Sequence, residues 1–392
     1  MKFSGLNISV PKEILAGERR VAAIPQTVEQ CIKAGARVMV EAGAGDKSYF
    51  HDEDYIQAGA EIVTNTEELY SKADVILKVK EPQHNPTLNK HEVELMPAGS
   101  ILISFLHPAN PSNHAMVKKL ADSGITSFTL DSIPRISRAQ HLDTLTSMST
   151  VAGYKSVIIA AHNLSRFIPM MPTSAGVLQP AQILVVGVGV AGLQAIATAK
   201  RLGAKVKTLD IRPEANEQAR SLGAEPIPFD LPEGLGIGEG GYAKRLPEEW
   251  YEKEREIMAP HVKASDAVIL AALIPGERAP VLINKAMVEM MSKGSVIIDI
   301  SIDQGGNCEL SRAGEEYDYD GIYISALLNI PAYLPVDSSR MFAQNTYNYL
   351  NYLMEEGKLK FDLEDEVIRQ SLVTNDYKVV HQGTLKAMEE NN

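Results

Sequence analysis

A glycine-rich segment in the middle of the chain has the spacing of a phosphate-binding turn. Gly187, Gly189 and Gly192 follow the apolar run Ile183–Val186, and a helical pattern begins at Val190. In a strand–turn–helix unit, the first glycine allows a tight turn, the second lets the backbone approach a pyrophosphate, and the third lets helix and strand pack closely. The helix N-terminus adds unpaired N–H groups that bind phosphates. This segment predicts a dinucleotide site.

An acidic residue stands where such a site needs an acceptor for the adenosine ribose. Asp210 ends the strand pattern Lys205–Leu209 and follows Gly187 by 23 residues, as in NAD-binding units. Its charge would repel a 2′-phosphate, so the segment predicts NAD(H) as the cofactor. Ile211, which comes next, is expected to contact the cofactor. We interpret Arg212 as solvated or stacked on adenosine, although an arginine here could also bind a 2′-phosphate.

Composition excludes several other classes of function. The chain has 392 residues and a formal net charge of −12, so we expect no basic surface for nucleic acid. Its two cysteines, Cys31 and Cys308, form no disulfide framework, and its nine histidines show no metal-ligand spacing. No signal peptide and no transmembrane stretch is expected. These features predict a reduced, cytoplasmic chain that has no metal site and does not insert into the membrane itself.

Strand and helix patterns alternate along the first third of the chain. The expected strands are Asn7–Val10, Arg37–Glu41, Val75–Lys80, Ser100–Leu106 and Thr126–Leu130. The expected helices lie near Pro25–Ala34, Asp52–Ala58, Thr66–Ala73 and Ser112–Ser123. This alternation is typical of a mostly parallel sheet with helices on both faces.

The second half of the chain repeats the alternation. Its expected strands are Ile183–Val186, Lys205–Leu209, Ala267–Leu270 and Ser295–Ile300. Long helical patterns at Thr146–Phe167 and Ser338–Glu356 connect the halves, and the run Gly234–Gly241 is expected to be a mobile loop. We predict an α/β fold of two doubly wound, Rossmann-like domains joined by long helices. Residues 1–145 plus 337–392 are assigned to an N-terminal docking domain, and residues 146–336 to an NAD(H)-binding domain.

Several further blocks of sequence are similar to those of one family. They are Asp-Ser-Ile-Pro-Arg-Ile-Ser-Arg-Ala-Gln-His-Leu-Asp at 131–143, Gly-Tyr-Ala-Lys at 241–244, Ala-Leu-Ile-Pro-Gly at 272–276, Ala-Pro-Val-Leu-Ile at 279–283 and Gly-Gly-Asn-Cys-Glu at 305–309. In this order they resemble the NAD(H)-binding alpha subunit of proton-translocating NAD(P) transhydrogenase, of the alanine dehydrogenase/pyridine nucleotide transhydrogenase family. The resemblance covers essentially the whole chain.

The resemblance implies a reaction and its partners. Hydride would pass directly between NAD(H) on this chain and NADP(H) on a partner subunit, coupled to proton translocation across the membrane. The nicotinamide would lie in a cleft between the two domains. The implied partners are membrane-spanning and NADP-binding subunits, and the chain itself is expected to be a homodimer. It would be peripheral on the inner face of the bacterial plasma membrane, held there by its partners.

The resemblance also implies which residues hold the nicotinamide. Arg135, Gln140 and Asp143 match the family's ring-contacting set, and we expect them to be catalytic because they orient the ring. Gln140 offers a donor and an acceptor to the carboxamide, and Arg135 offers a fork of donors. The expected cofactor contacts are completed by Ile136, Ser137, Arg138, Thr146, Gly241, Tyr242 and Leu273. Thr146 keeps a hydroxyl where the family pattern has serine, and Tyr242 matches the tip of a loop that folds over the nucleotide.

Two alternatives stay open. Alanine dehydrogenase, in the same family, binds pyruvate with an arginine, a lysine, a histidine and an aspartate, and the matching candidates here are Arg20, Lys80, His107 and Asp303. Against this activity, Tyr154 stands where the dehydrogenase pattern has arginine, and dehydrogenases lack the 134–143 block. An NAD-binding regulator without hydride transfer is the other alternative. The sequence favours the transhydrogenase subunit.

Overall fold

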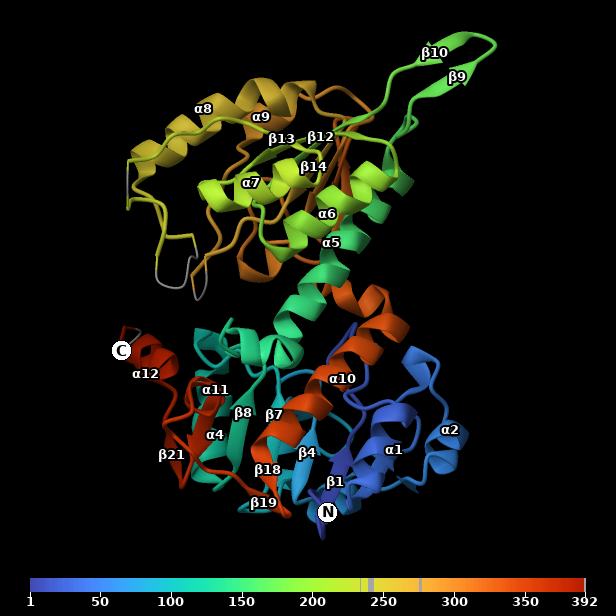
Figure 1. The fold of residues 1–392 in the computed structure, drawn as a ribbon, viewed down its shortest axis with the longest axis vertical. Helices are drawn as coiled ribbons and strands as arrows, with labels where there is room; N and C mark the ends of the chain where they lie inside the picture. The colour runs from blue at the N-terminus through green and yellow to red at the C-terminus, as the bar shows by residue number, and fades with distance from the viewer. Residues whose placement is uncertain (233, 239–242, 275–276, 391–392) are drawn as a thin grey trace. The chain divides into compact units, whose positions relative to one another are not determined.

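The computed structural model describes residues 1–392 except 233, 239–242, 275–276 and 391–392 (Figure 1). Contacts divide the chain into two compact units. Unit 1 contains residues 1–148 and 332–392, and unit 2 contains residues 149–331. The chain passes from unit 1 to unit 2 within helix α5 (Thr144–Asn163) and returns just before helix α10 (Pro335–Leu353).

Unit 1 is built on an eight-stranded sheet. Its strands are β1 (Asn7–Val10), β2 (Arg37–Glu41), β3 (Glu61–Val63), β4 (Val75–Leu77), β7 (Ile101–Ser104), β8 (Thr126–Thr129), β20 (Leu372–Asn375) and β21 (Lys378–Val379). They lie in the order β21-β20-β8-β7-β4-β1-β2-β3, and only β20 and β21 run antiparallel to their neighbours. The six parallel strands have the doubly wound order 3-2-1-4-5-6, with the switch point between β1 and β4.

Helices and small hairpins complete unit 1. The helices are α1 (Pro25–Lys33), α2 (Asp52–Gln57), α3 (Thr66–Ser71), α4 (His114–Asp122), α11 (Glu366–Ser371), α12 (Gln382–Glu390) and the 3₁₀ turns η1 (Asp46–Ser48), η2 (Glu92–Leu95), η3 (Pro111–Asn113) and η4 (Ser137–Leu142). Two hairpins pair β5 (His84–Asn85) with β6 (Lys90–His91) and β18 (Met354–Glu355) with β19 (Lys358–Leu359). Helix α10 begins at Pro335, because proline is well suited to the first helical position.

Unit 2 has a seven-stranded sheet of the same design. Its strands are β11 (Gln182–Val186), β12 (Lys205–Leu209), β13 (Glu225–Pro226), β14 (Ala267–Leu270), β15 (Val296–Asp299), β16 (Glu316–Tyr319) and β17 (Ile322–Ser325). They lie in the order β13-β12-β11-β14-β15-β17-β16, and only the edge strand β16 is antiparallel to its neighbour. The switch point of this sheet lies between β11 and β14.

Both faces of the unit 2 sheet are covered by helices. They are α6 (Val190–Arg201), α7 (Pro213–Ser221), α8 (Glu248–Ala264), α9 (Lys285–Glu289), η6 (Ile302–Gln304) and η7 (Ile330–Tyr333). Along β11, Ile183 and Val185 pack into a cluster with α6 and α7, whereas Leu184 and Val186 pack into another with α8 and α9. A strand buried on both faces reads as an unbroken apolar run, as β11 does. A hairpin of β9 (Met171–Thr173) and β10 (Gly176–Leu178) projects from this unit (Figure 1).

The predicted fold class is confirmed in its two mostly parallel sheets and its connecting helices, but several bounds were wrong. The strand expected at Val75–Lys80 ends at Leu77, since a glutamate side chain, not a neighbouring strand, binds the Val79 N–H. The helix expected at Thr146–Phe167 ends at Asn163, whose side-chain amide donates to the Ile159 carbonyl. Short strands at the sheet edges were missed.

Two further observations bear on the predictions. The glycine-rich run Gly234–Gly241 lies partly outside the described residues, and among the residues of this region that are described, Ile237 pairs with Ala243. Among the residues that the structure describes, no helix has the length and apolarity that crossing a membrane requires.

Candidate functional site

The glycine-rich turn lies at the switch point of the unit 2 sheet. Gly187 has φ +86°, and a Cβ there would lie 2.5 Å from the Ala272 nitrogen. At Gly192, a Cβ would lie 2.0 Å from the Gly187 carbonyl oxygen. Gly189, by contrast, has no atom within 4 Å of the place a Cβ would take, and it precedes Val190 at the start of α6. Two glycines therefore serve backbone packing, while Gly189 leaves open space before a helix N-terminus.

A neighbouring glycine, Gly153 in α5, was not expected to matter. A Cβ there would lie 2.1 Å from the Ala191 carbonyl oxygen at the start of α6. The close approach of α5 therefore supports the first turn of α6 from behind.

The Asp210 carboxylate is buried and fully hydrogen bonded. The Val188 N–H donates to Oδ2 at 2.7 Å, and the Arg212 N–H donates to Oδ1 at 2.8 Å. The Arg212 guanidinium adds a bidentate contact, with Nε 2.9 Å from Oδ1 and Nη2 2.8 Å from Oδ2. Because a carboxylate accepts about four hydrogen bonds, a ribose hydroxyl has to displace one of these donors. Arg212 is thus held against Asp210 and is not solvated.

The other sequence-predicted contacts of unit 2 fall in three kinds of place. Ile211 packs on the apolar cluster beneath α8 and α9. Leu273 follows β14 and is 41% exposed, whereas its neighbour Ile274 is buried. Gly241 and Tyr242 lie outside the described residues.

A buried acid–amide network, which sequence reasoning missed, fixes the loops after β14 and β15. The Asn307 side chain accepts from the Ala272 N–H at 3.0 Å and donates to the Ala272 carbonyl at 2.9 Å. Asp299 accepts from the Asn307 N–H, the Cys308 N–H and the Ser311 hydroxyl. Burial raises the pKa of Asp299, although these hydrogen bonds oppose the rise. The network holds Ala272 against the glycine turn, and the Gly-Gly-Asn block was its only sequence signal.

Asp210→Ala is expected to weaken discrimination against NADPH. The change removes the acceptor for the ribose and frees the Arg212 guanidinium for a 2′-phosphate. With charge-assisted hydrogen bonds contributing about 1.5–3 kcal/mol, the ratio of the NADPH to the NADH dissociation constant should fall roughly 10- to 100-fold. Calorimetric titration measures both constants, with the exposed Glu217→Gln in α7 as the control. An unchanged ratio would show that the ribose acceptor lies elsewhere.

The predicted nicotinamide loop lies in unit 1, between β8 and α5. Arg135, Ser137, Arg138 and Gln140 are exposed, and Ile136 is half-buried. Residues 137–142 form the 3₁₀ turn η4, and the Arg138 guanidinium reaches Asp365 at 3.3 Å. The loop therefore presents a row of polar side chains on a turn that the C-terminal segment anchors.

Asp143 has a structural task that the prediction did not include. Its Oδ1 accepts from the Thr146 N–H at 2.8 Å, and its Oδ2 accepts from the Thr146 hydroxyl at 2.6 Å. Asp143 is thus the N-cap of α5 and fixes where that helix begins. The carboxylate positions the loop through the helix, and the hydroxyl of Thr146 is half of that contact.

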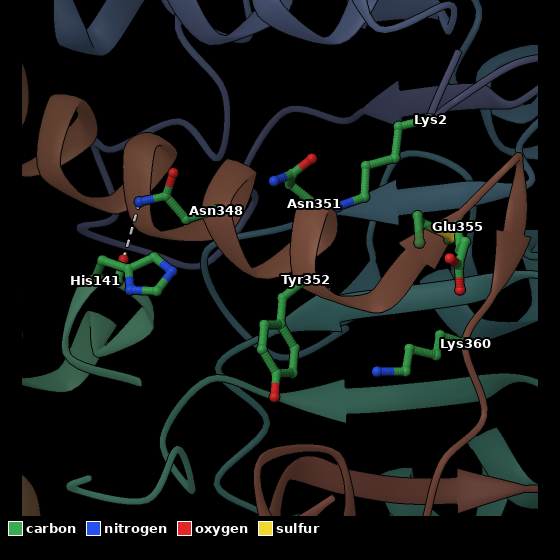
Figure 2. Close-up of a pocket in the computed structure, with 8 residues that line it drawn as sticks. Lys2, His141, Asn348, Asn351, Tyr352, Glu355 and Lys360 are labelled. Atoms are coloured by element: carbon green, nitrogen blue, oxygen red, sulfur yellow. Dashed lines mark hydrogen bonds between the residues drawn. The ribbon is translucent and has the colours of Figure 1, made fainter. Parts of the chain in front are cut away.

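A pocket of about 280 Å³ lies beside η4 in unit 1 (Figure 2). It is lined by Lys2, His141, Asn348, Asn351, Tyr352, Met354, Glu355 and Lys360. None of these is a predicted site residue. The His141 carbonyl accepts from the Asn345 and Asn348 amides at 2.9 and 3.0 Å, which fixes η4 against α10. This wall of the pocket supports the loop that carries Gln140.

The switch point of the unit 1 sheet holds a cluster of buried charges that was not predicted. Lys78 Nζ lies 3.0 Å from Glu92 Oε1 and 3.4 Å from Glu13 Oε2. The Tyr70 hydroxyl donates to Glu92 at 2.8 Å, and the Val79 N–H donates to Glu13 at 2.6 Å. Burial raises the pKa of Glu13 to about 7, with the Lys78 charge opposing it. These long-range contacts join the loops after β1 and β4.

Lys78→Met is expected to destabilise the fold by about 3–5 kcal/mol, because two buried carboxylates lose their shared cation. Chemical denaturation followed by circular dichroism measures the change. Lys90→Met, which breaks the exposed pair with Glu67, is the matched control and should cost less than about 1 kcal/mol. Equal small losses in both variants would contradict the assignment.

The four residues of the alanine dehydrogenase alternative are divided between the units. Arg20 is buried and donates through Nε and Nη2 to both carboxylate oxygens of Glu18. His107 has φ +44° and places Nδ1 2.7 Å from Asp131 Oδ2. Burial lowers the pKa of His107, but the Asp131 carboxylate outweighs burial and raises it above its ordinary value. Lys80 is half-buried in unit 1, and Asp303 is exposed in unit 2.

Comparison with known proteins gives a consistent set of similarities. The model of the alanine dehydrogenase/PNT N-terminal domain matches residues 9–152, and that of the C-terminal domain matches residues 156–382. The first of the polypeptides that make up NAD(P) transhydrogenase subunit alpha in Rhodospirillum rubrum is 41% identical over 96% of this chain and 98% of its own length. Alanine dehydrogenase of Methanococcus maripaludis is 31% identical over 97% of this chain and 96% of its own length.

A solved structure agrees. The transhydrogenase from Sinorhizobium meliloti superimposes with a TM-score of 0.81 at 35% identity, covering 96% of this chain and 99% of its own. With both domain models matched and relatives aligned over nearly its full length, this chain belongs to the alanine dehydrogenase/PNT family.

Proposed function

We propose that this chain is the NAD(H)-binding alpha subunit of an NAD(P) transhydrogenase. The observation that carries the proposal is the glycine turn at the switch point of unit 2, with Asp210 beside it, in a chain 41% identical to a transhydrogenase alpha subunit. Alanine dehydrogenases are more distant relatives, at 31–32% identity.

The residues at the turn fit a dinucleotide. Open space beside Gly189 and the N-terminus of α6 suit a pyrophosphate, because backbone N–H groups are available there and no side chain obstructs them. Asp210 is one strand away and suits the adenosine ribose. Bound NADH supplies the hydride itself. We assign the nucleotide contacts to Gly187, Gly189, Val190, Gly192, Asp210, Ile211, Arg212 and Leu273, with Gly241 and Tyr242 also assigned from the sequence.

The loop of unit 1 is assigned the task of orienting the nicotinamide. Arg135 and Gln140 would hold the carboxamide, with Ile136, Ser137 and Arg138 beside them, and Asp143 with Thr146 would fix the loop by capping α5. Orientation is the protein's main contribution, because hydride moves directly between two nicotinamides without a protein nucleophile or general acid.

We further propose the partners and the place of action. The chain would work as a homodimer with an NADP(H)-binding subunit and membrane-spanning subunits, on the cytoplasmic face of the bacterial plasma membrane, and hydride transfer would be coupled to proton translocation. Residues 146–336 would form the NAD(H)-binding domain, and residues 1–145 with 337–392 the docking domain. The Rhodospirillum rubrum relative is named as one portion of a divided alpha subunit, which supports the existence of other subunits.

The purified chain tests this proposal in two steps. Alone, it should bind NADH but reduce no NADP⁺, because it carries one dinucleotide turn. Adding the NADP-binding and membrane subunits should start the reaction, followed by absorbance with an NAD⁺ analogue as acceptor. Hydride exchange between NADH and NADP⁺ by the chain alone would contradict the need for a partner.

Alanine dehydrogenase activity is the second candidate, favoured by the His107–Asp131 pair. A histidine whose pKa is raised by a carboxylate suits proton transfer near neutral pH. NADH absorbance with pyruvate and ammonium decides between the candidates. The transhydrogenase assignment predicts no oxidation while NADH stays bound, and rapid oxidation that His107→Ala abolishes would establish the dehydrogenase.

A further inference from the structure

A buried acid on α8 lies outside the contacts assigned to the NAD(H) site. The Glu254 side chain is 3% exposed. Its carboxyl group makes no hydrogen bond or ion pair with any residue that the structure describes. Buried carboxyl groups are almost always paired, so an unpartnered one calls for a ligand or a functional reason.

The topology places Glu254 at the same end of the sheet as Asp210. Helix α8 ends at Ala264, just before β14 begins at Ala267, so its C-terminus lies at the amino end of the parallel strands. Glu254 is ten residues earlier, or about 15 Å along the helix at 1.5 Å per residue. Since β14 spans only about 10 Å, Glu254 lies level with the carboxyl ends of the strands.

The packing of α8 brings Glu254 toward the end of β12. Tyr251 and Met258 flank Glu254 on the buried face of the helix. Both belong to one apolar cluster with Leu209, the residue before Asp210, and Ile211 packs on the same cluster. Two acids thus border the carboxyl end of β12: Asp210 is neutralised by Arg212, whereas Glu254 has no cation paired with it among the described residues.

We propose that Glu254 is a second acidic determinant of cofactor choice, whose ionised carboxylate opposes the anionic nucleotide and most strongly a 2′-phosphate. This inference rests on the proposed NAD(H) site at the glycine turn. In its protonated form Glu254 can donate a hydrogen bond in the ribose region; in its ionised form it adds a negative charge next to two phosphates.

The surrounding charges set the pH at which this change occurs. Burial raises the pKa of Glu254 to about 8, the Asp210 carboxylate adds to the rise, and Arg255 on the same helix opposes it. Arg212 pairs with Asp210, while Arg245, with its partner Glu277, acts on Tyr251 one turn before Glu254. A bound dianion would raise the pKa of Glu254 further, so affinity is full below pH 8 and declines as the pH rises above it.

NADH binding across pH 6.5–9.5 tests the inference, measured by calorimetry on the whole chain. Wild-type affinity should fall roughly three- to tenfold between pH 7 and pH 9.5, since each unit of pKa difference between free and bound states is tenfold in affinity. Glu254→Gln should remove that fall and bind NADH, and more so NADPH, more tightly than wild type at pH 9. Glu256→Gln, an exposed acid on the same helix, should keep the wild-type profile.

Proton uptake gives a second readout that a purely structural role would not move. Calorimetry at pH 8.5 in buffers of different ionisation enthalpy should show wild type taking up a fraction of a proton on binding NADH, and Glu254→Gln losing that uptake. Parallel pH profiles and equal uptake in the two proteins would overturn the inference while leaving the NAD(H) site intact. Absence of NADH binding at every pH would overturn the proposed function and this inference together.

Discussion

Gly187→Ala is expected to abolish NADH binding and to destabilise unit 2 by about 3 kcal/mol or more. A left-handed backbone costs an L-residue about 1–2 kcal/mol, and the new Cβ would lie 2.5 Å from the Ala272 nitrogen. Ala272 cannot move away freely, because the buried Asn307 amide holds its N–H and its carbonyl. The clash therefore has to open the turn itself.

Gly189→Ala is the matched variant, and it separates binding from folding. No atom lies within 4 Å of the added Cβ, so stability should change by less than about 1 kcal/mol. The methyl group would occupy the space assigned to the pyrophosphate, and NADH affinity should fall roughly 10- to 100-fold.

Thermal unfolding and NADH titration on both variants check this pair. A stable Gly187→Ala variant with normal NADH affinity would contradict the packing argument. A Gly189→Ala variant with unchanged affinity would place the pyrophosphate elsewhere.

Gln140→Asn and Arg135→Ala are expected to slow hydride transfer roughly 100-fold while changing NADH affinity less than about fivefold. The phosphates and the ribose are assigned to unit 2, so most binding energy survives when a nicotinamide contact is lost. A displacement of the ring by about 1 Å is enough for a loss of this size in rate. Single-turnover transfer in the complete enzyme gives the rate, and titration of the chain gives the affinity.

His141→Gln serves as the control for the loop variants. Its side chain is exposed, and its contacts with Asn345 and Asn348 use the backbone carbonyl, which the substitution keeps. The control should transfer hydride at the wild-type rate. Equal losses of rate and affinity in Gln140→Asn would show that the loop is only a binding contact.

The sequence predicted best where local pattern and burial agree. Strands Lys205–Leu209 and Ala267–Leu270 were predicted to the residue, because each is a compact β-rich segment bounded by clear turn signals. The glycine turn was predictable for a similar reason: two of its three glycines answer to backbone clashes that the motif itself encodes.

Features that depend on distant residues escaped the sequence. Lys78 meets Glu13 and Glu92, which are 65 and 14 residues away, and no local pattern announces a buried ion cluster. The Asn307 network likewise joins residues 35 positions apart. Arg212 was expected in solvent because its neighbours are polar, but the short link to Asp210 turns the guanidinium back onto the carboxylate.

Isotope transfer tests the central claim most directly. The chain, its NADP-binding partner and the membrane subunits are mixed with NADP⁺ and NADH that carries deuterium on one or the other face of nicotinamide C4. Direct transfer predicts that one of the two isomers delivers its deuterium to NADPH without loss to water. NADPH that carries hydrogen from solvent with both isomers, or no NADPH at all, would contradict a transhydrogenase subunit.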